Sequence, residues 1–407
     1  MGVTLVAAPS LATARMTEAA AVATIAPSRE RARMNQRVFD SVWSEVRTQY
    51  YDPHLHGVDW NAARQTYRPL ALAADDDRAL YRVLDDMLNL LDDDHAGAAS
   101  PAIARRQDAQ RERRAAIGVT LRPDPAHPGD YLIESVRSGS PAEVAGVSEG
   151  WRLHIVDGGW SPEQDVVEGR TVSLIFFDED ERSHALDLTP AIMEPRPPFV
   201  ADRTRRDVVV LRVEGFEAGL GRWMGAELAD LPPGTGVVID LRGNPGGRLL
   251  EAEAVLSCFL PRDQNWATRT LRSGRQIELN ARGGCGDLDS PIPNEVAVLV
   301  DGDSRSAAEL TPAALKEARR AIVIGERTAG AVLISQDTRL PDGGRLTLSR
   351  SDFVTSGGVR LEKRGVSPDL EAAVTRQDRR EGRDPALDAA IAVLSGETAL
   401  AATEPSL

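Results

Sequence analysis

The spacing of hydrophobic positions changes twice along the chain and divides it into three regions. From residue 31 to residue 112 apolar side chains recur mostly at helical spacing, which predicts an N-terminal helical domain. Residues 113–195 alternate between apolar and polar positions, which predicts short strands. Residues 199–375 alternate strand-like and helical segments, as in a sheet with helices on its faces. Residues 1–30 are rich in Ala, Thr and Pro and are predicted to be disordered, while residues 376–407 are expected to form a helix and a tail.

The individual elements follow from the same patterns. The helices of the first region are expected at 31–50, 60–67 and 77–91, followed by an arginine-rich connector at 102–115. The expected strands of the second region are 117–121, 131–136, 170–177 and 184–188, with a linker at 192–198. The third region predicts strands at 208–213, 237–240, 295–300 and 321–325, a late strand pair at 345–350 and 353–355, and helices at 221–231, 249–259 and 309–319.

Composition excludes several classes of function. The 407 residues carry a net charge of -14 and no basic cluster interleaved with aromatic residues, which argues against nucleic acid as a partner. No apolar run approaches the roughly 20 residues that a membrane helix needs, so no integral membrane segment is expected. No metal-binding cluster emerges from the histidines, and no metal or organic cofactor is expected.

The cysteines and the N-terminus concern the compartment. Cys258 and Cys285 have no C-x-x-C spacing, and one disulfide or two separate buried thiols fit equally well. Residues 1–14 contain a short apolar stretch and an Ala-Thr-Ala site, like the end of a signal peptide, but no positive segment precedes them. We therefore expect export to the periplasm or the extracellular space; the alternative is a plain disordered tail on a cytoplasmic protein.

A serine lies at an expected strand-to-helix turn. Five apolar residues, 296–300, are followed by turn formers and then by Ser304-Arg-Ser-Ala-Ala-Glu309. At such a turn the backbone fixes a hydroxyl near the first N–H groups of the helix, as a nucleophile requires. The alternative is that Ser304 and Ser306 only cap the helix.

A glycine-rich loop follows the strand predicted at 237–240. It is Asp240-Leu-Arg-Gly-Asn-Pro-Gly-Gly247, and its glycines permit positive φ and close approach of a substrate to the backbone. Phosphate binding is one alternative, but the spacing matches neither nucleotide-binding motif. A structural tight turn is the other.

The second region resembles a PDZ domain of the permuted bacterial kind. The resemblance rests on Gly139-Ser-Pro-Ala-Glu-Val-Ala-Gly146 and Glu149-Gly-Trp-Arg-Leu-His-Ile-Val-Asp-Gly158, with Trp151 where the family usually has aspartate. It implies that a peptide end binds at the loop Ile117-Gly118-Val119. The alternative is a spacer without a ligand.

Four ordered motifs resemble the C-terminal processing (tail-specific) serine peptidase family. They are the glycine-rich loop, the serine motif, Gly325-Glu-Arg-Thr-Ala-Gly330 and Glu362-Lys-Arg-Gly-Val-Ser-Pro-Asp369. The resemblance implies an α/β multidomain fold with an N-terminal helical region, a PDZ-like β-rich domain and an α/β protease core of the ClpP/crotonase kind. It also implies Ser306 as nucleophile, with the N–H groups of Gly247 and Ala307 as the oxyanion hole.

The general base departs from the best-known branch of that family. That branch places a lysine directly after the Gly-Glu-x-Thr-x-Gly motif, where this chain has Ala331. A second branch, resembling the tricorn core protease, uses Ser, His and Glu. Leu91-Asp-Asp-Asp-His95 and Glu362 match its motifs, which implies His95 as base and Glu362 as the residue that orients it, although position alone would make His95 a solvated loop residue.

These residues predict a serine endopeptidase that acts on peptides or unfolded proteins through an acyl-enzyme. Asp94 is expected to influence His95, and Glu309 to support the serine loop. The other five histidines are expected to be structural or solvated. The rival hypothesis is a degenerate peptidase that serves as a peptide-binding scaffold, for which Ala331 and Trp151 speak.

Overall fold

The computed structural model describes residues 27–397, apart from 110–113, 125, 138, 156–165, 194–196, 206, 376 and 379–380. The expectation for residues 1–30 falls almost wholly outside the described residues, as does the end of the expected C-terminal tail. Within the described part, helices and several sheets form a mixed α/β fold, as the sequence predicted.

A six-stranded, mostly parallel sheet forms the centre of the C-terminal half. Its order is β18-β15-β14-β11-β10-β9, and only β9 runs antiparallel to its neighbour. All residues of β11 and β14 are buried, because both faces of the sheet are covered. The strands are β9 (Phe199–Asp202), β10 (Val208–Val213), β11 (Gly236–Asp240), β14 (Val296–Val300), β15 (Ile322–Gly325) and β18 (Leu370–Glu371).

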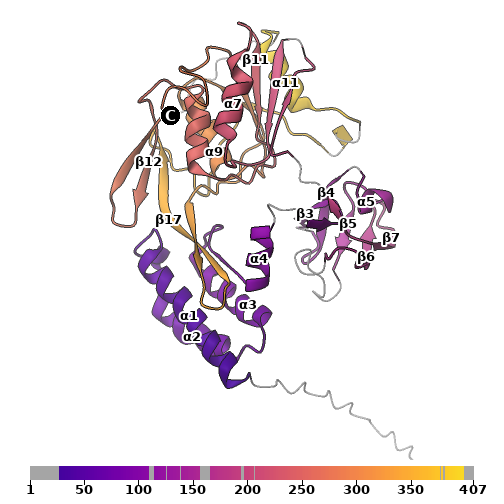
Figure 1. The fold of residues 1–407 in the computed structure, drawn as a ribbon, viewed down its shortest axis with the longest axis vertical. Helices are drawn as coiled ribbons and strands as arrows, with labels where there is room; N and C mark the ends of the chain where they lie inside the picture. The colour runs from indigo at the N-terminus through magenta and orange to yellow at the C-terminus, as the bar shows by residue number, and fades with distance from the viewer. Residues whose placement is uncertain are drawn as a thin grey trace, which may run out of the picture.

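Alternate residues of these strands enter two separate cores. Val237 and Val298 pack with helices α7, α8 and α9 on one face, whereas Val238 and Leu299 pack with α11 on the other. Figure 1 shows these helices on either side of β11. The helices are α7 (Leu220–Ala229), α8 (Leu249–Ser257), α9 (Ala307–Glu317) and α11 (Pro385–Leu394).

A second sheet departs from the sequence prediction. The pair expected at 345–350 and 353–355 is wrong: one strand, β17 (Arg345–Thr355), runs through both segments. Its partners had not been predicted, because their polar residues hide the alternation that pairing with β17 imposes. The partners are β1 (Gly97–Ala99), β16 (Ile334–Arg339) and β12 (Asn265–Leu271), and β12 pairs in turn with β13 (Gln276–Asn280).

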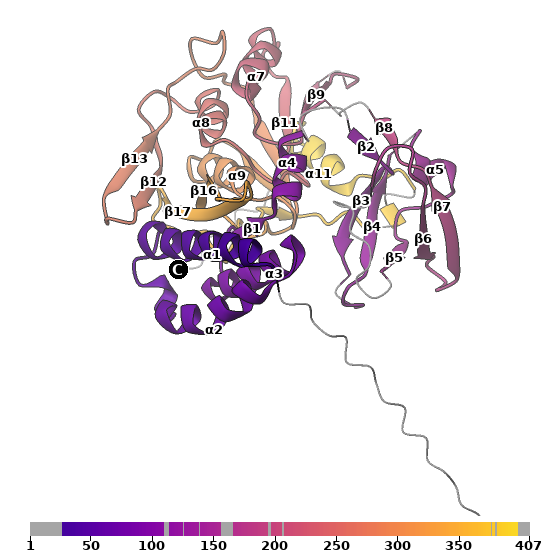
Figure 2. The same ribbon diagram turned by 60° about the horizontal axis from the view of Figure 1, so that its bottom comes forward.

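The N-terminal helices pack against this second sheet. Their core includes Leu346 and Leu348 of β17, so the helical region and the C-terminal half of the chain share one apolar core. Figures 1 and 2 both show β17 beside this region. The second helix is longer than predicted, and the expected connector contains helix α4. The elements are α1 (Arg29–Gln49), η1 (Leu55–Gly57), α2 (Trp60–Ala73), α3 (Asp77–Leu88), η2 (Asn89–Leu91) and α4 (Pro101–Ala109).

The alternating region forms a separate five-stranded antiparallel sheet. Its order, β3-β4-β5-β6-β7, leaves β3 at an edge, and its own core includes Ile133 and Phe176. A two-stranded ribbon joins its entry and exit, and the linker expected at 192–198 begins within that ribbon. The elements are β2 (Arg114–Ala116), β3 (Val119–Pro123), β4 (Tyr131–Val136), α5 (Pro141–Val144), β5 (Arg152–His154), β6 (Val172–Phe177), β7 (Ser183–Leu188) and β8 (Ala191–Met193).

A disulfide joins Cys258, at the end of α8, to Cys285. Of the two arrangements that the sequence left open, the structure has the bonded one, and both residues are buried. Among the described residues, none of the helices has the length and apolar character to cross a membrane.

Candidate functional site

Ser306 occupies the turn between β14 and α9. The helix begins at Ala307, two residues before the predicted start, so Ser306 stands at the N-cap position. Its backbone has φ 54° and ψ -117°, a conformation that non-glycine residues rarely adopt. Such strain persists only where surrounding contacts enforce it, and it is concentrated at functional sites.

Ser304 stabilises the turn. Its hydroxyl accepts the Asp301 N–H at 3.0 Å and donates to the carbonyl of Leu241 at 2.8 Å. This ties the turn after β14 to the start of the glycine-rich loop after β11. Ser304 therefore has a structural role, and it is fully buried.

The glycine-rich loop lies directly against Ser306. The Asn244 carbonyl accepts the Arg305 N–H at 2.9 Å. A Cβ added to Gly246 would lie 2.7 Å from Ser306 Cβ and 2.7 Å from the Arg305 carbonyl oxygen. No side chain fits there, which is the physical reason for glycine at this position.

Two backbone N–H groups beside Ser306 remain free to bind an oxyanion. Phe216 donates to the Gly246 carbonyl and accepts from Arg248, each at 2.8 Å, which leaves the Gly247 N–H between them unused. The Ala307 N–H belongs to the first turn of α9 and has no partner within the helix. Neither N–H group donates a hydrogen bond to another described residue. The structure thus brings together Ser306, Gly247 and Ala307.

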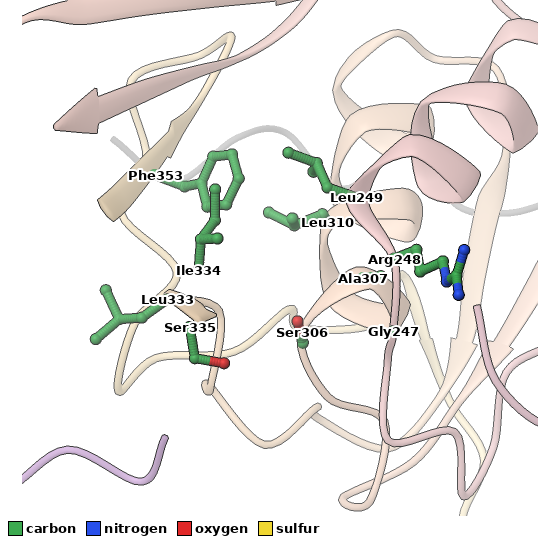
Figure 3. A pocket seen from close by; sticks show the side chains of 10 residues that line it. All are labelled: Gly247, Arg248, Leu249, Ser306, Ala307, Leu310, Leu333, Ile334, Ser335 and Phe353. Carbon is green, nitrogen blue, oxygen red and sulfur yellow. The ribbon is translucent and has the colours of Figure 1, made fainter. Parts of the chain in front are cut away.

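A pocket of about 230 Å³ opens beside Ser306. Figure 3 shows Phe353, Ile334 and Leu310 gathered on one side of Ser306, with the Arg248 side chain directed away from them. The lining of this pocket is mostly apolar and comes from the glycine-rich loop, the starts of α8, α9 and β16, and from β17. The lining residues are Gly247, Arg248, Leu249, Ser306, Ala307, Leu310, Leu333, Ile334, Ser335 and Phe353.

Glu309 supports the serine turn, as the sequence led us to expect. It is fully buried, and its carboxylate accepts the N–H groups of Ser306 at 3.1 Å, Gly330 at 2.7 Å and Ala331 at 2.8 Å. The hydroxyl of Thr328 donates to the same carboxylate at 2.6 Å. The Ala331 carbonyl also accepts the Ser306 N–H, at 2.8 Å.

His95 is a half-buried residue in the neighbourhood of this turn. Its side chain is 17% exposed, which excludes the solvated-loop alternative. Burial lowers the pKa of His95 below its ordinary value, against the opposing effect of nearby carboxylates. The charges of Glu309 and Arg305, which flank Ser306, also act on this pKa. Its Nδ1 has no hydrogen-bond partner among the described residues.

Glu362 approaches the histidine loop from the other side. It is 5% exposed, its Oε2 accepts the Val332 N–H at 2.8 Å, and its Oε1 is buried without a hydrogen-bond partner among the described residues. Burial raises the pKa of the Glu362 carboxyl, and the charge of Asp93 raises it further. The next residue, Lys363, pairs with Asp94 at 3.2 Å. Glu362 and His95 therefore lie in one region, but no hydrogen bond between them is present.

The carboxylate beside the His95 ring belongs to Asp93, which occupies the aspartate position of the L-x-D-x-H motif but for which the sequence predicted no role. Asp93 Oδ1 lies 3.8 Å from His95 Nδ1 and accepts the His95 backbone N–H at 2.8 Å. Three consecutive aspartates precede His95, and their spacing alone does not tell which one turns inward. Asp94, the expected influence, is exposed and pairs with Lys363, although its charge also acts on the pKa of His95.

The remaining histidines have local partners. His56 donates from Nδ1 to the Leu91 carbonyl at 2.8 Å, which holds the start of the loop that leads to His95. His127, His154 and His184 each contact an aspartate within the small sheet domain. Within the described ranges, the side chains that could bind a metal ion do not gather into groups of three or more.

The loop Ile117-Gly118-Val119 lies at the start of edge strand β3. The carbonyls of Ile117 and Gly118 accept N–H groups from Ala142 and Arg137, at 2.9 and 2.8 Å. Gly118 has φ 85°, and a Cβ there would overlap the Ser140 side chain. The loop is thus fixed against helix α5.

A strained serine at a strand-to-helix turn, beside two free N–H groups and a buried histidine, is typical of serine hydrolases. Residues 207–372 match the sequence profile of peptidase family S41, and residues 32–89 match that of the tricorn protease C1 domain. Residues 207–372 therefore form a domain of peptidase family S41, a family of serine-type peptidases to which C-terminal processing proteases similar to this chain belong.

Curated relatives extend the match over most of the chain. This chain is 27% identical over 387 residues to the putative tricorn protease homolog 2 of Streptomyces coelicolor. The alignment covers 88% of this chain but only 32% of that protein. This chain is 25% identical over 372 residues to the chloroplastic C-terminal processing peptidase of Tetradesmus obliquus, over 83% and 77% of the two chains.

Solved structures show the same fold. The photosystem II D1 C-terminal processing protease aligns with a TM-score of 0.60 and 24% identity, over 85% of this chain and 95% of that one. Mature CPAF aligns with a TM-score of 0.59 and 15% identity, over 91% and 99%. At these identities the likeness concerns the fold alone.

We predict that Gly246→Ala abolishes activity, because the added Cβ displaces Ser306 and the Ala307 N–H, which lies 3.1 Å from it. Gly243→Ala in the same loop is the matched control: it has a similar positive φ, but its Cβ meets nothing within 4 Å. Hydrolysis of a fluorogenic peptide should fall about 100-fold or more in the first variant, as for loss of oxyanion stabilisation, and within about threefold in the second. Equal rates in the two variants would contradict the placement of this loop at the reacting centre.

Proposed function

We propose that the chain is a serine endopeptidase in which Ser306 is the nucleophile, His95 the general base and Glu362 the residue that orients and balances the histidine. The observation that carries the proposal is the strained Ser306, set between the free N–H groups of Gly247 and Ala307 at the mouth of an apolar pocket. The buried His95 nearby supplies the base that Ala331 cannot.

The reaction follows from these positions. His95 Nε2 takes the Ser306 hydroxyl proton as Oγ attacks the peptide carbonyl carbon, and the carbonyl oxygen becomes an oxyanion bound by the Gly247 and Ala307 N–H groups. The protonated His95 then gives its proton to the leaving amine as the C–N bond breaks, which leaves an acyl-enzyme on Ser306. Water attacks the ester, His95 accepts a proton from that water and returns it to Ser306 Oγ, and the acid product leaves.

The lowered pKa of His95 suits this task, because the imidazole is then neutral over most of the physiological range. Its catalytic hydrogen bonds are not formed in the resting structure. Catalytic hydrogen bonds of free enzymes are often long and shorten only when substrate is bound. We propose that Glu362 Oε1, which lacks a partner, meets the His95 ring when the site closes on a substrate.

The pocket indicates the class of residue at the cleavage site. The pocket is lined by large apolar side chains, and its volume suits an aliphatic side chain. These side chains are Leu249, Leu310, Leu333, Ile334 and Phe353. An unfolded peptide segment with an apolar residue before the scissile bond is the expected substrate.

We predict that Ser306→Ala and His95→Ala each reduce turnover of an unfolded protein on the order of 10⁴-fold, as for members of a catalytic unit. A fluorophosphonate should label Ser306 in the unmodified protein but not in Ser306→Ala. Mass spectrometry of the products should find apolar residues before the cut bonds. Full turnover by both variants would sink the mechanism, and a folded protein with no turnover and no adduct would favour the rival peptide-binding scaffold.

We further propose that residues 113–195 form a PDZ-like domain that binds the end of a peptide. The open edge of β3, which pairs only with β4, supports this proposal, since such domains add a peptide strand to a sheet edge. The fixed turn at Gly118 would seat a carboxylate at the start of that edge. By the same division, we propose that residues 31–112 form the helical domain and residues 199–375 the α/β peptidase core of the ClpP/crotonase kind, followed by a C-terminal helix and tail at 376–407, of which the structure describes the helix α11 (Pro385–Leu394).

We predict that a peptide with a free C-terminal carboxylate slows amide hydrogen exchange in β3, whereas the same peptide with a C-terminal amide does so at least tenfold more weakly. Ser306→Ala protein serves for this measurement, because it should not cleave the peptide. Unchanged exchange in β3 at saturating peptide would leave the domain as a spacer.

We also propose that the protein is exported to the periplasm or the extracellular space, because the disulfide between Cys258 and Cys285 is typical of oxidising compartments. Intact producing cells, treated with a thiol alkylating reagent before lysis, should yield protein with both cysteines unmodified. Alkylation of both in most of the protein would contradict export and favour the cytoplasm.

A further inference from the structure

Asp93 has an unusual environment for an aspartate in a run of three. Its side chain is completely buried, whereas the neighbouring side chains of Asp92 and Asp94 are 88% and 53% exposed. Its Oδ1 accepts the His95 N–H, its Oδ2 is buried, and the Tyr50 hydroxyl lies near enough for a hydrogen bond with this carboxylate to raise the pKa of Tyr50. A completely buried carboxylate is costly, so a role beyond turn formation would explain its presence.

Three other buried polar atoms lie near this carboxylate: the Tyr50 hydroxyl, His95 Nδ1 and Glu362 Oε1. The last two have no hydrogen-bond partner within the described part of the chain. The charge of Asp93 acts on all three groups and raises the pKa of each. These groups come from the end of α1, the loop that carries His95 and the segment after β17, so the fold itself gathers them near Asp93.

We propose that Asp93 is a positioning residue for His95: its fixed carboxylate holds the histidine loop and balances the imidazolium that forms during acyl transfer, in addition to Glu362. This inference rests on the proposed function of His95 as the base. Ser306 and His95 would then work with two buried carboxylates rather than one.

Glu362 alone is a poor counter-charge for a protonated His95. Burial raises the pKa of the Glu362 carboxyl, so its charged form is disfavoured, and the charge of Asp93 raises that pKa further. A buried imidazolium requires a compensating charge in the same low-dielectric region. Asp93 is suited to this role because its Oδ1 is 2.8 Å from the His95 backbone nitrogen and 3.8 Å from the ring.

The test is Asp93→Asn, which keeps an oxygen to accept the His95 N–H and removes only the charge. The pKa of His95 lies below its ordinary value because of burial, and Asp93 opposes that shift. Removing the charge should therefore move the acid limb of kcat/KM, already below about pH 6.5, to still lower pH. We expect kcat to fall about tenfold or more and KM to change less than threefold.

Asp94→Asn is the matched control. It removes the same charge from the adjacent residue, which is exposed and paired with Lys363. Its kcat should remain within about twofold, and the acid limb should move in the same direction but by less. NMR titration of His95, assigned by comparison with His95→Gln, measures the same two displacements without any need for turnover.

The outcomes separate this inference from the proposed function. If the unmodified protein hydrolyses its substrate but Asp93→Asn keeps kcat within twofold and leaves the His95 titration unmoved, the inference is overturned. If the unmodified protein has no turnover, the proposed function fails, while the NMR titration still tests the hold of Asp93 on His95.

A second variant covers failure to fold. The hydroxyl of Asp93→Ser also accepts the His95 N–H without a charge. Thermal unfolding is followed for both variants, and either one that folds decides the question. Failure of both to fold would assign Asp93 to stability alone and overturn the positioning role.

Discussion

The buried carboxylate of Glu309 is the contact on which the turn at Ser306, the proposed nucleophile, depends. It binds the backbone of Ser306 and, across the turn, the backbone of Gly330 and Ala331. A carboxylate without solvent is stable only when donors surround it, and here its donors hold the serine turn in a backbone conformation that Ser306 would not otherwise adopt. The same arrangement holds the backbone of Ala331, which stands where the family resemblance led us to expect a lysine, so the general base of the proposed mechanism comes from another part of the chain.

The proposed base, His95, follows the N-terminal helices, whose core shares residues with β17. Non-glycine residues with positive φ occur in each of the segments that meet there: Asp92 before the histidine, Ser306, and Lys363 after the glutamate. Lys363 pairs with Asp92 and Asp94, but these ion pairs are exposed and stabilise little by themselves. They show, however, that the loop carrying His95 and the segment carrying Glu362 lie side by side.

The sequence predicted the central strands because they are unbroken apolar runs, as in 296–300. It predicted most helices because their apolar residues recur at helical spacing. It did not predict β16, β12 or β13, because the register of β16 and β12 depends on pairing with β17, which includes buried serines at 349 and 351, and β13 pairs in turn with β12. The motifs identified Ser306, Gly247 and His95, and the structure groups the first two around one pocket. The sequence could not distinguish Asp93 from Asp94, because only the direction of each side chain decides which one meets the histidine. It also left open whether Cys258 and Cys285 are joined, as they are in the structure.

The most direct test of the account is a structure of the protein with a peptide boronate or aldehyde bound. The account predicts a covalent bond from Ser306 Oγ, with the oxyanion mimic within hydrogen-bond distance of the Gly247 and Ala307 nitrogens, the side chain before the reactive carbon in the apolar pocket, and His95 Nε2 within reach of Oγ. An adduct on another residue, or an oxyanion turned away from both nitrogens with His95 remote, would contradict it.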